Sequence, residues 1–198
     1  MDRRSLRESW DDIAQTYAAS RDPDGSDAAL IERLLAELPD EPKVLDIGPC
    51  DGARTLANLP AGSVGVDISR AALDLAAETV PAARLVQGDM TALPVATDSM
   101  DAITAYHAVF HVSRVEHPAV YDEFVRVLKS GGRLLMTLPT GRFETTRRGW
   151  MGGSMFFSAP GREETLSQLQ AAGFTSLRTE TADDPLGSRT EFVFARVE

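Results

Sequence analysis

The stretch Val44-Leu45-Asp46-Ile47-Gly48-Pro49-Cys50-Asp51-Gly52 decides the fold. Its first residues predict a short buried strand, and the two glycines predict a tight turn that opens a helix. In a sheet of parallel strands, ligands bind beyond the carboxyl ends of the strands, where such turns lie. The stretch therefore predicts a site for a nucleotide-like cofactor.

The side chains of this turn indicate which cofactor it favours. A turn that binds pyrophosphate presents bare backbone N–H groups and a helix N-terminus to the anion. Here Cys50 stands where a middle glycine would be, and Asp46 and Asp51 are expected to repel a pyrophosphate. S-adenosylmethionine carries a sulfonium and an ammonium against one carboxylate, so the turn favours this cationic cofactor over a nicotinamide dinucleotide.

Cys50 has a further consequence for the turn. A left-handed backbone would cost a residue with a Cβ atom about 1 kcal/mol or more. We therefore expect a negative φ at Cys50, or a slightly altered turn. A single cysteine cannot pair within the chain, and we expect it to act as a small apolar filler rather than in redox chemistry.

Two later acids also follow predicted strands. Asp67 ends the segment Ser63–Asp67, where a carboxylate can accept hydrogen bonds from both hydroxyls of a ribose. Asp89 follows the strand Arg84–Gln87 and could accept from the exocyclic amine of an adenine, while Met90 covers the ring. Beside these positions, Ile68 and Tyr106 are further expected cofactor-binding residues.

The rest of the chain alternates predicted strands and helices, which implies βαβ units, right-handed crossovers and a doubly wound, mainly parallel sheet. Two helices precede the first strand, one with an apolar stripe from Trp10 to Tyr17 and one from Leu30 to Leu38. The expected elements after them are Lys43–Ile47, Gly52–Leu59, Val64–Asp67, Ala71–Thr79, Arg84–Gln87, Ala102–Tyr106, Ala119–Leu128, Arg133–Leu138, Arg162–Ala171, Ser176–Thr181 and Glu191–Val197. The short connection from Asp183 to Arg189 predicts that the last two strands form a hairpin.

From about Trp10 to its C-terminus, the chain resembles the class I S-adenosylmethionine-dependent methyltransferases, in particular the small-molecule group called methyltransferase type 11. The resemblance rests on several motifs in the family's order. They are its D-x-G-x-G-x-G turn at Asp46–Gly52, its acid at Asp67, its G-D-x-x-x-L-P block at Gly88–Pro94, its L-K-x-G-G-x-L connector at Leu128–Leu134 and its A-G-F at Ala172–Phe174. It implies a Rossmann-like sheet of seven strands, with one antiparallel strand near the C-terminus, and methyl transfer from S-adenosylmethionine.

The resemblance also implies roles for single residues. Asp46 would hold the ammonium group, directly or through water, with the backbone of Gly48 to Gly52 against the methionine part. Tyr17 and Arg21 would contact the methionine carboxylate. Three scattered histidines and one cysteine give no metal-ligand spacing, so we expect no metal.

The acceptor side of the reaction is less clearly marked. His107 follows the fourth core strand and could take a proton from the acceptor, or could only pack beside the cofactor. We expect His111 to begin the next turn and His117 to lie in a surface loop. The aperiodic segment 139–161 contains aromatic residues and arginines, among them Arg147 and Trp150, and is a candidate lid over the acceptor.

Composition limits the classes of protein. The length of 198 residues fits one domain, which we divide into a helical lid (1–40), a cofactor-binding core (41–138), the candidate acceptor lid (139–161) and a C-terminal helix with a strand hairpin (162–198). A net charge of −10 disfavours nucleic acid as a partner. No run of apolar residues is long enough for a membrane span or a signal peptide, so we expect a cytoplasmic protein without a membrane partner.

The sequence predicts an enzyme that methylates a small molecule, and it identifies neither the acceptor nor the oligomeric state. Two other classes stay open: a non-catalytic S-adenosylmethionine-binding or regulatory protein, and, less favoured, a nicotinamide-dependent oxidoreductase.

Overall fold

A computed structural model describes residues 2–22, 24–183 and 186–198. Its centre is a seven-stranded sheet with the order β3-β2-β1-β4-β5-β9-β8. The strands are β1 (Val44–Ile47), β2 (Val64–Asp67), β3 (Arg84–Gln87), β4 (Met100–Ala105), β5 (Leu128–Leu138), β8 (Phe174–Asp183) and β9 (Arg189–Val197). β9 runs antiparallel to both of its neighbours, while the pairs among β1 to β5 are parallel. The Rossmann-like architecture with one antiparallel strand, as predicted, is confirmed.

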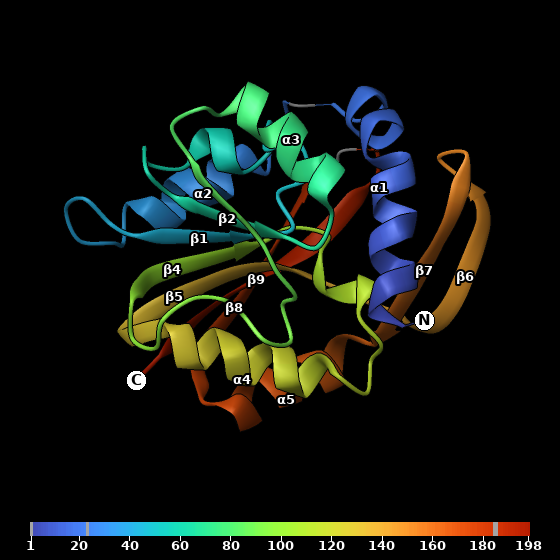
Figure 1. Ribbon diagram of the computed structural model, residues 1–198. Helices are drawn as coiled ribbons and strands as arrows, with labels where there is room; N and C mark the ends of the chain where they lie inside the picture. Colours follow the sequence, from blue (N-terminus) through green and yellow to red (C-terminus); the bar gives the residue numbers. More distant parts are fainter. Residues whose placement is uncertain (1, 23, 184–185) are drawn as a thin grey trace.

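Helices cover both faces of the sheet (Figure 1). α2 (Ala28–Leu35) and α3 (Arg70–Thr79) lie on one face, and α4 (His117–Val127) and α5 (Arg162–Ala172) on the other. Successive residues of a strand point to opposite faces, so Val44 packs in the core under α2 whereas Leu45 packs in the core under α4. β1 is buried along its whole length, as expected of a parallel strand covered on both sides.

The segment after the glycine turn differs from the expected helix Gly52–Leu59. Only the single 3₁₀ turn η1 (Leu56–Asn58) forms there. The side chains of Arg54 and Thr55 are directed inward, where they donate hydrogen bonds to Asp27 and Asp46, and Pro60 stops any helix beyond Leu59. The turn therefore lacks the helix N-terminus that pyrophosphate-binding turns use.

The candidate acceptor lid, residues 139–161, contains an antiparallel hairpin. Its strands are β6 (Arg142–Trp150) and β7 (Gly153–Pro160). It stands beside α1 (Arg3–Ser20) at one end of the sheet, where both orange strands lie to the right of the blue helix in Figure 1. At Gly153 a Cβ atom would lie 2.6 Å from Cγ2 of Ile13, so glycine permits the close approach of hairpin and helix.

α1 crosses the carboxyl ends of three strands and is held by a polar contact at each. After β3, Nε of Arg3 donates to Oδ2 of Asp89 at 2.5 Å. After β2, Oδ1 of Asp11 accepts hydrogen bonds from the Ser69 hydroxyl (2.7 Å) and the Ala71 amide (3.1 Å). After β1, Arg21, the residue that caps the helix, pairs with Asp51. The helix thus forms a roof over the loops where the sequence predicts the cofactor.

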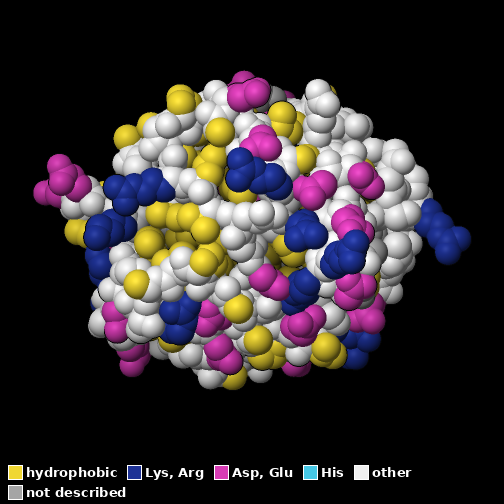
Figure 2. Space-filling model, in the orientation of Figure 1, with side chains coloured by type: hydrophobic (Ala, Val, Ile, Leu, Met, Phe, Trp, Pro, Cys, Tyr) yellow, Lys and Arg dark blue, Asp and Glu magenta, His cyan; other side chains and the backbone are white. Residues whose placement is uncertain are grey.

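The surface shows the acidic composition as a mixture of charges. Figure 2 shows acidic and basic side chains interspersed over one face of the molecule, without a broad basic area on that face. Within the described residues, no helix is long and apolar enough to cross a membrane.

His117 does not lie in a surface loop as expected; it is the first residue of α4 and is fully buried. The next residue, Pro118, occupies the first turn of the helix, where proline is tolerated. Nε2 of His117 lies 3.1 Å from the carbonyl oxygen of Val112, and burial lowers the pKa of its imidazole to about 4.

This burial predicts a loss of stability in acid. Because the pKa of His117 is lower in the folded than in the unfolded protein, its contribution is present above pH 6.5 and is lost as the pH falls towards 4. At pH 5 the loss amounts to about 2 kcal/mol. Urea unfolding at pH 7 and at pH 5 measures how far the free energy of unfolding falls between the two. In His117→Gln this fall should be smaller than in the wild type by about the same amount. Equal drops in the two proteins would contradict the buried neutral histidine.

The docking of α1 predicts a difference between two neighbouring acids. Asp11→Ala removes two hydrogen bonds to the start of α3 and should cost roughly 1–3 kcal/mol of stability. Asp12→Ala is the matched control, because Asp12 is exposed and makes none of these contacts. Hydrogen exchange should be faster across α1 in the Asp11 variant only. The same exchange rates in both variants would show that the contact with α3 does not hold the helix.

Candidate functional site

A cavity lies between α1 and the loops that follow β1, β2, β3 and β4, and we call it the inner cavity. Its lining includes all the cofactor-binding residues expected from the sequence except Asp46 and Gly52, and it also includes the expected catalytic histidine. These lining residues are Tyr17, Arg21, Gly48, Cys50, Asp67, Ile68, Asp89, Met90, Tyr106 and His107. The folded chain therefore gathers residues that are up to 90 positions apart in the sequence.

The glycine turn forms one wall of the inner cavity, and its backbone is left-handed at several residues. Gly48 has a φ of 68°, and a Cβ atom there would lie 2.9 Å from Cβ of Ala108. The turn therefore requires glycine at this position, both for its backbone angle and for the space beside the β4 loop.

Cys50 corrects one expectation, since its φ is 56° rather than negative. Its amide donates a hydrogen bond of 3.2 Å to Oδ2 of Asp67, and this contact with the next strand helps to hold the strained residue. Burial raises the pKa of the Cys50 thiol to about 12, so the thiol stays protonated at neutral pH. It is an apolar part of the wall and not a nucleophile.

Asp46 lies under the turn and not on the cavity wall. Its Oδ1 accepts a hydrogen bond of 2.7 Å from the Thr104 hydroxyl, and its Oδ2 accepts one from the Thr55 hydroxyl. The side chain is fully enclosed, and burial raises the pKa of its carboxyl to about 6. These two hydroxyls bind the carboxylate that was expected to hold an ammonium group, directly or through water.

Asp67 does face the inner cavity. Its Oδ1 accepts from the Ser69 amide at 2.9 Å and its Oδ2 from the Cys50 amide at 3.2 Å. Each carboxylate oxygen has a second lone pair, so both can accept one more hydrogen bond. Burial raises the pKa of this carboxyl to about 6.

At the β3 end of the cavity, the carboxylate of Asp89 already has protein partners. It pairs with Arg3 and accepts hydrogen bonds from the amide and hydroxyl of Thr91. Met90 lies beside it on the cavity wall. The contact between Arg3 and Asp89 could not be predicted from the sequence, because the two residues are 86 positions apart.

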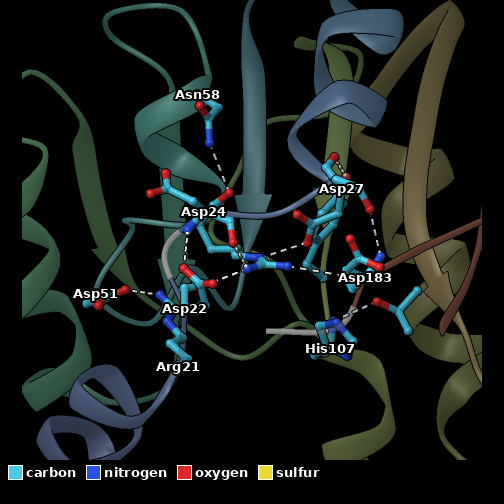
Figure 3. A network of polar contacts seen from close by, with 12 residues as sticks. Arg21, Asp22, Asp24, Asp27, Asp51, Asn58, His107 and Asp183 are labelled. Carbon is cyan, nitrogen blue, oxygen red and sulfur yellow. Dashed lines mark hydrogen bonds and ion pairs between the residues drawn. The ribbon is translucent and has the colours of Figure 1, made fainter. Parts of the chain in front are cut away.

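At the β1 end, Arg21 is turned toward Asp51 (Figure 3). Its guanidinium lies 5.3 Å from the centre of the Tyr17 ring, and its Nε is buried with no hydrogen-bond partner. Asp51 is therefore neutralised by an ion pair, so it does not present the free negative charge that was expected to repel a pyrophosphate. The missing helix N-terminus described above also disfavours a pyrophosphate.

A network behind Arg21 fixes the chain that enters the site. Arg54, almost completely buried, pairs with Asp27 at 2.8 Å and donates to the carbonyl oxygens of Asp22, Asp24 and Asp183. Figure 3 shows these acidic residues gathered from the segment after α1 and from β8. Arg54 was not predicted from the sequence, because it stands where an ordinary surface position of a helix was expected.

A second cavity, which we call the outer cavity, adjoins the first and has a volume of about 390 Å³. It lies between the β6–β7 hairpin and the ends of β5 and β9. Three residues, Tyr17, His107 and His111, line both cavities. The two spaces therefore share a boundary at the carboxyl end of β4.

The two histidines at this boundary are held in different ways. His107 has a left-handed backbone with a φ of 53°, and its amide donates to the hydroxyl of Thr137 at 2.9 Å. His111 ends the 3₁₀ helix η2 (Val109–His111), with Nδ1 at 2.9 Å from the carbonyl oxygen of Phe156. Burial lowers the pKa of His111 to about 4, so its ring is neutral at neutral pH. A carbonyl only accepts, so Nδ1 carries the proton.

An aromatic wall runs along the two cavities. It consists of Trp10, Tyr17, His111, Trp150 and Phe157, whose neighbouring rings have centroids 4.9–6.0 Å apart. Both of the protein's tryptophans belong to it. In the part of the chain that the structure describes, no group of three or more possible metal ligands is found.

Comparison with known proteins agrees with the arrangement of these elements. A family model described as a methyltransferase domain matches residues 45–136, from β1 to β5. A methyltransferase from Oceanobacillus iheyensis is 23% identical over 150 residues, which are 74% of this chain. The match spans 63% of the length of that relative.

Solved structures share the fold at low sequence identity. An S-adenosylmethionine-dependent methyltransferase from Methanosarcina mazei has a TM-score of 0.70 at 18% identity, covering 83% of this chain and 96% of its own. The [4+2]-cyclase SpnF has a TM-score of 0.75 at 17% identity, covering 100% and 97%. A methyltransferase in complex with the Trm112 activator of Haloferax volcanii has a TM-score of 0.72 at 17% identity, covering 98% of each chain. The family model thus marks residues 45–136 as a methyltransferase domain, and the order of the sheet is shared with solved S-adenosylmethionine-dependent methyltransferases.

Proposed function

We propose that the inner cavity binds S-adenosylmethionine and that the enzyme transfers the methyl group to a small molecule in the outer cavity. The observation that carries this proposal is the common boundary of the two cavities at Tyr17, His107 and His111. A methyl donor in one space and an acceptor in the other would meet there.

The chemistry of the inner cavity fits this donor. The buried Nε of Arg21 has no hydrogen-bond partner, and a carboxylate such as that of the methionine part would supply one. Asp67 has an open lone pair on each oxygen, which suits two neighbouring ribose hydroxyls. Met90 offers an apolar surface to the adenine, and Asp89 stands beside it.

Asp46 receives a different role from the one expected. Because its side chain is buried under the turn and does not line the inner cavity, we propose that it orders the turn through the two threonine hydroxyls and does not contact the ammonium group directly. The electrostatic effect remains, since an ionised carboxylate in a dry interior favours a nearby cation. Its influence would reach the cofactor through the Gly48 turn.

The sulfonium is an activated donor, so the protein's main tasks are to align the reactants and exclude water. α1 and the aromatic wall exclude water from the boundary of the two cavities. A proton leaving the acceptor would find His107 there, and its role as a base stays a prediction beside the simpler one of packing. The ring of His111 is fixed by Phe156 and would present an unprotonated Nε2.

The two other classes make different predictions in solution. A non-catalytic protein would bind S-adenosylmethionine without releasing S-adenosylhomocysteine in the presence of any acceptor. A nicotinamide-dependent oxidoreductase would bind NAD at least as tightly as S-adenosylhomocysteine. Measurement of product release and of NAD affinity separates both from the proposed enzyme.

Asp67 provides the test of the donor site. Asp67→Ala should lose roughly 2–4 kcal/mol of affinity for S-adenosylhomocysteine in titration calorimetry, because two hydrogen bonds to a charged group disappear. Asp74→Ala, an exposed acid on α3, should leave the affinity unchanged. Since burial raises the pKa of Asp67 to about 6, wild-type affinity should also fall below pH 6, and this fall should be smaller in Asp67→Ala.

A folded Asp67→Ala protein with wild-type affinity and the same pH dependence would place the ribose elsewhere and contradict the assignment. Circular dichroism of both variants shows whether the fold is retained.

A further inference from the structure

The outer cavity has an unusual lining for so acidic a protein. With a net charge of −10, acids outnumber bases by 30 to 20. Yet none of the described residues that line this cavity is acidic, and Arg147 is the one arginine or lysine among them. The polar remainder consists of hydroxyl groups such as those of Thr137 and Thr190, and of the two histidines already described.

The apolar side of the cavity is aromatic. Phe110, Phe143, Trp150 and Phe157 contribute to its walls, so flat rings border the space on the side of the β6–β7 hairpin. Aromatic side chains pack best against other planar rings, through stacked or edge-to-face contacts. The shape of this lining therefore favours a planar apolar ligand over a flexible polar one.

Arg147 supplies a positive charge to the outer cavity and does not line the inner cavity. Its guanidinium is 4.8 Å from the centre of the Phe157 ring, on the exposed strand β6. Within the described part of the chain, Arg147 forms no ion pair. Two other arginines, Arg142 and Arg148, occur on the same strand. Arg147 lines the outer cavity alone, whereas His107 and His111 line both.

We infer that the acceptor is an aromatic acid, with its ring against Phe157 and Trp150 and its carboxylate on Arg147. This inference rests on the proposed function of the two cavities. A guanidinium binds a carboxylate through two parallel hydrogen bonds and also stacks on an aromatic ring, and Arg147 already has the second contact. A cationic acceptor would find no described carboxylate on these walls and would meet Arg147 instead.

This orientation also assigns the end of the acceptor that reacts. With the carboxylate on Arg147, the opposite end of the ring points toward His107 and His111, so a hydroxyl or amine there is methylated and the carboxylate is not. Its lone pair forms the bond to the methyl carbon, and the electron pair of the broken carbon–sulfur bond stays on sulfur. The sulfonium becomes a neutral thioether, and the acceptor's proton passes to His107 or to water.

Two probes of equal shape and opposite charge test the inference. 3-(4-Hydroxyphenyl)propanoate and tyramine share a phenol ring and differ in the charge at the far end, and hexanoate supplies a carboxylate without a ring. We expect calorimetry in the presence of saturating S-adenosylhomocysteine to show at least tenfold tighter binding of the phenolic acid than of tyramine or hexanoate.

Arg147→Gln should remove the preference for the phenolic acid over tyramine. Arg148→Gln is the matched control, since Arg148 is the next residue on the same exposed strand and does not line the cavity. It should keep the full preference. Both residues are exposed, so neither variant should disturb the fold.

The outcomes separate this inference from the function on which it rests. Tyramine binding as tightly as the acid, hexanoate binding equally well, or the same behaviour of the two arginine variants would each overturn the aromatic-acid acceptor. So would binding of S-adenosylhomocysteine without binding of any probe, which leaves the proposed methyl transfer intact. Failure of S-adenosylhomocysteine itself to bind would instead refute the proposed function.

Discussion

The site depends on the way α1 is fastened across the sheet. Arg3, Asp11 and Arg21, spread along this helix and its cap, make polar contacts with the loops after β3, β2 and β1. The inner cavity exists because a helix lies over these loops, and β7 in turn packs on that helix through Gly153. The outer cavity then has one wall on the hairpin. The first helix also contributes to both cavities, because Tyr17 lines each of them.

Beneath this roof, two buried acids hold the glycine turn in place. Asp46 binds two threonine hydroxyls from opposite sides of the turn, and Asp67 binds the amide of the left-handed Cys50. Burial raises the pKa of both carboxyls to about 6, which indicates that an ionised carboxylate is costly in this interior. A bound cation would lower that cost. On the proposed function, these two buried acids favour a positively charged cofactor, and of the two only Asp67 lies on the cavity wall.

The strands of the core and their order of appearance could be predicted, because buried apolar runs such as Val44–Ile47 and the glycines beside them are local signals. Most of the residues that were expected to bind the cofactor also line the inner cavity, because most of them follow these strands.

The errors in the prediction come from contacts between distant parts of the chain. Cys50 adopts a left-handed backbone that a contact with Asp67 supports, and His117 is buried by the packing of α4. The hairpin escaped prediction because β6 is exposed on nearly every residue and has no alternation. The contacts of Arg3 and Arg54 join distant parts of the sequence, and no local pattern indicates them.

A crystal structure of the protein with S-adenosylhomocysteine tests the account most directly. It should show the ligand between α1 and the ends of β1 to β3, with both ribose hydroxyls within hydrogen-bonding distance of Asp67. The carboxylate of the ligand should accept a hydrogen bond from Nε of Arg21. The sulfur should face the boundary formed by Tyr17, His107 and His111. A ligand bound in the outer cavity, or one whose ribose lies away from Asp67, would contradict the account.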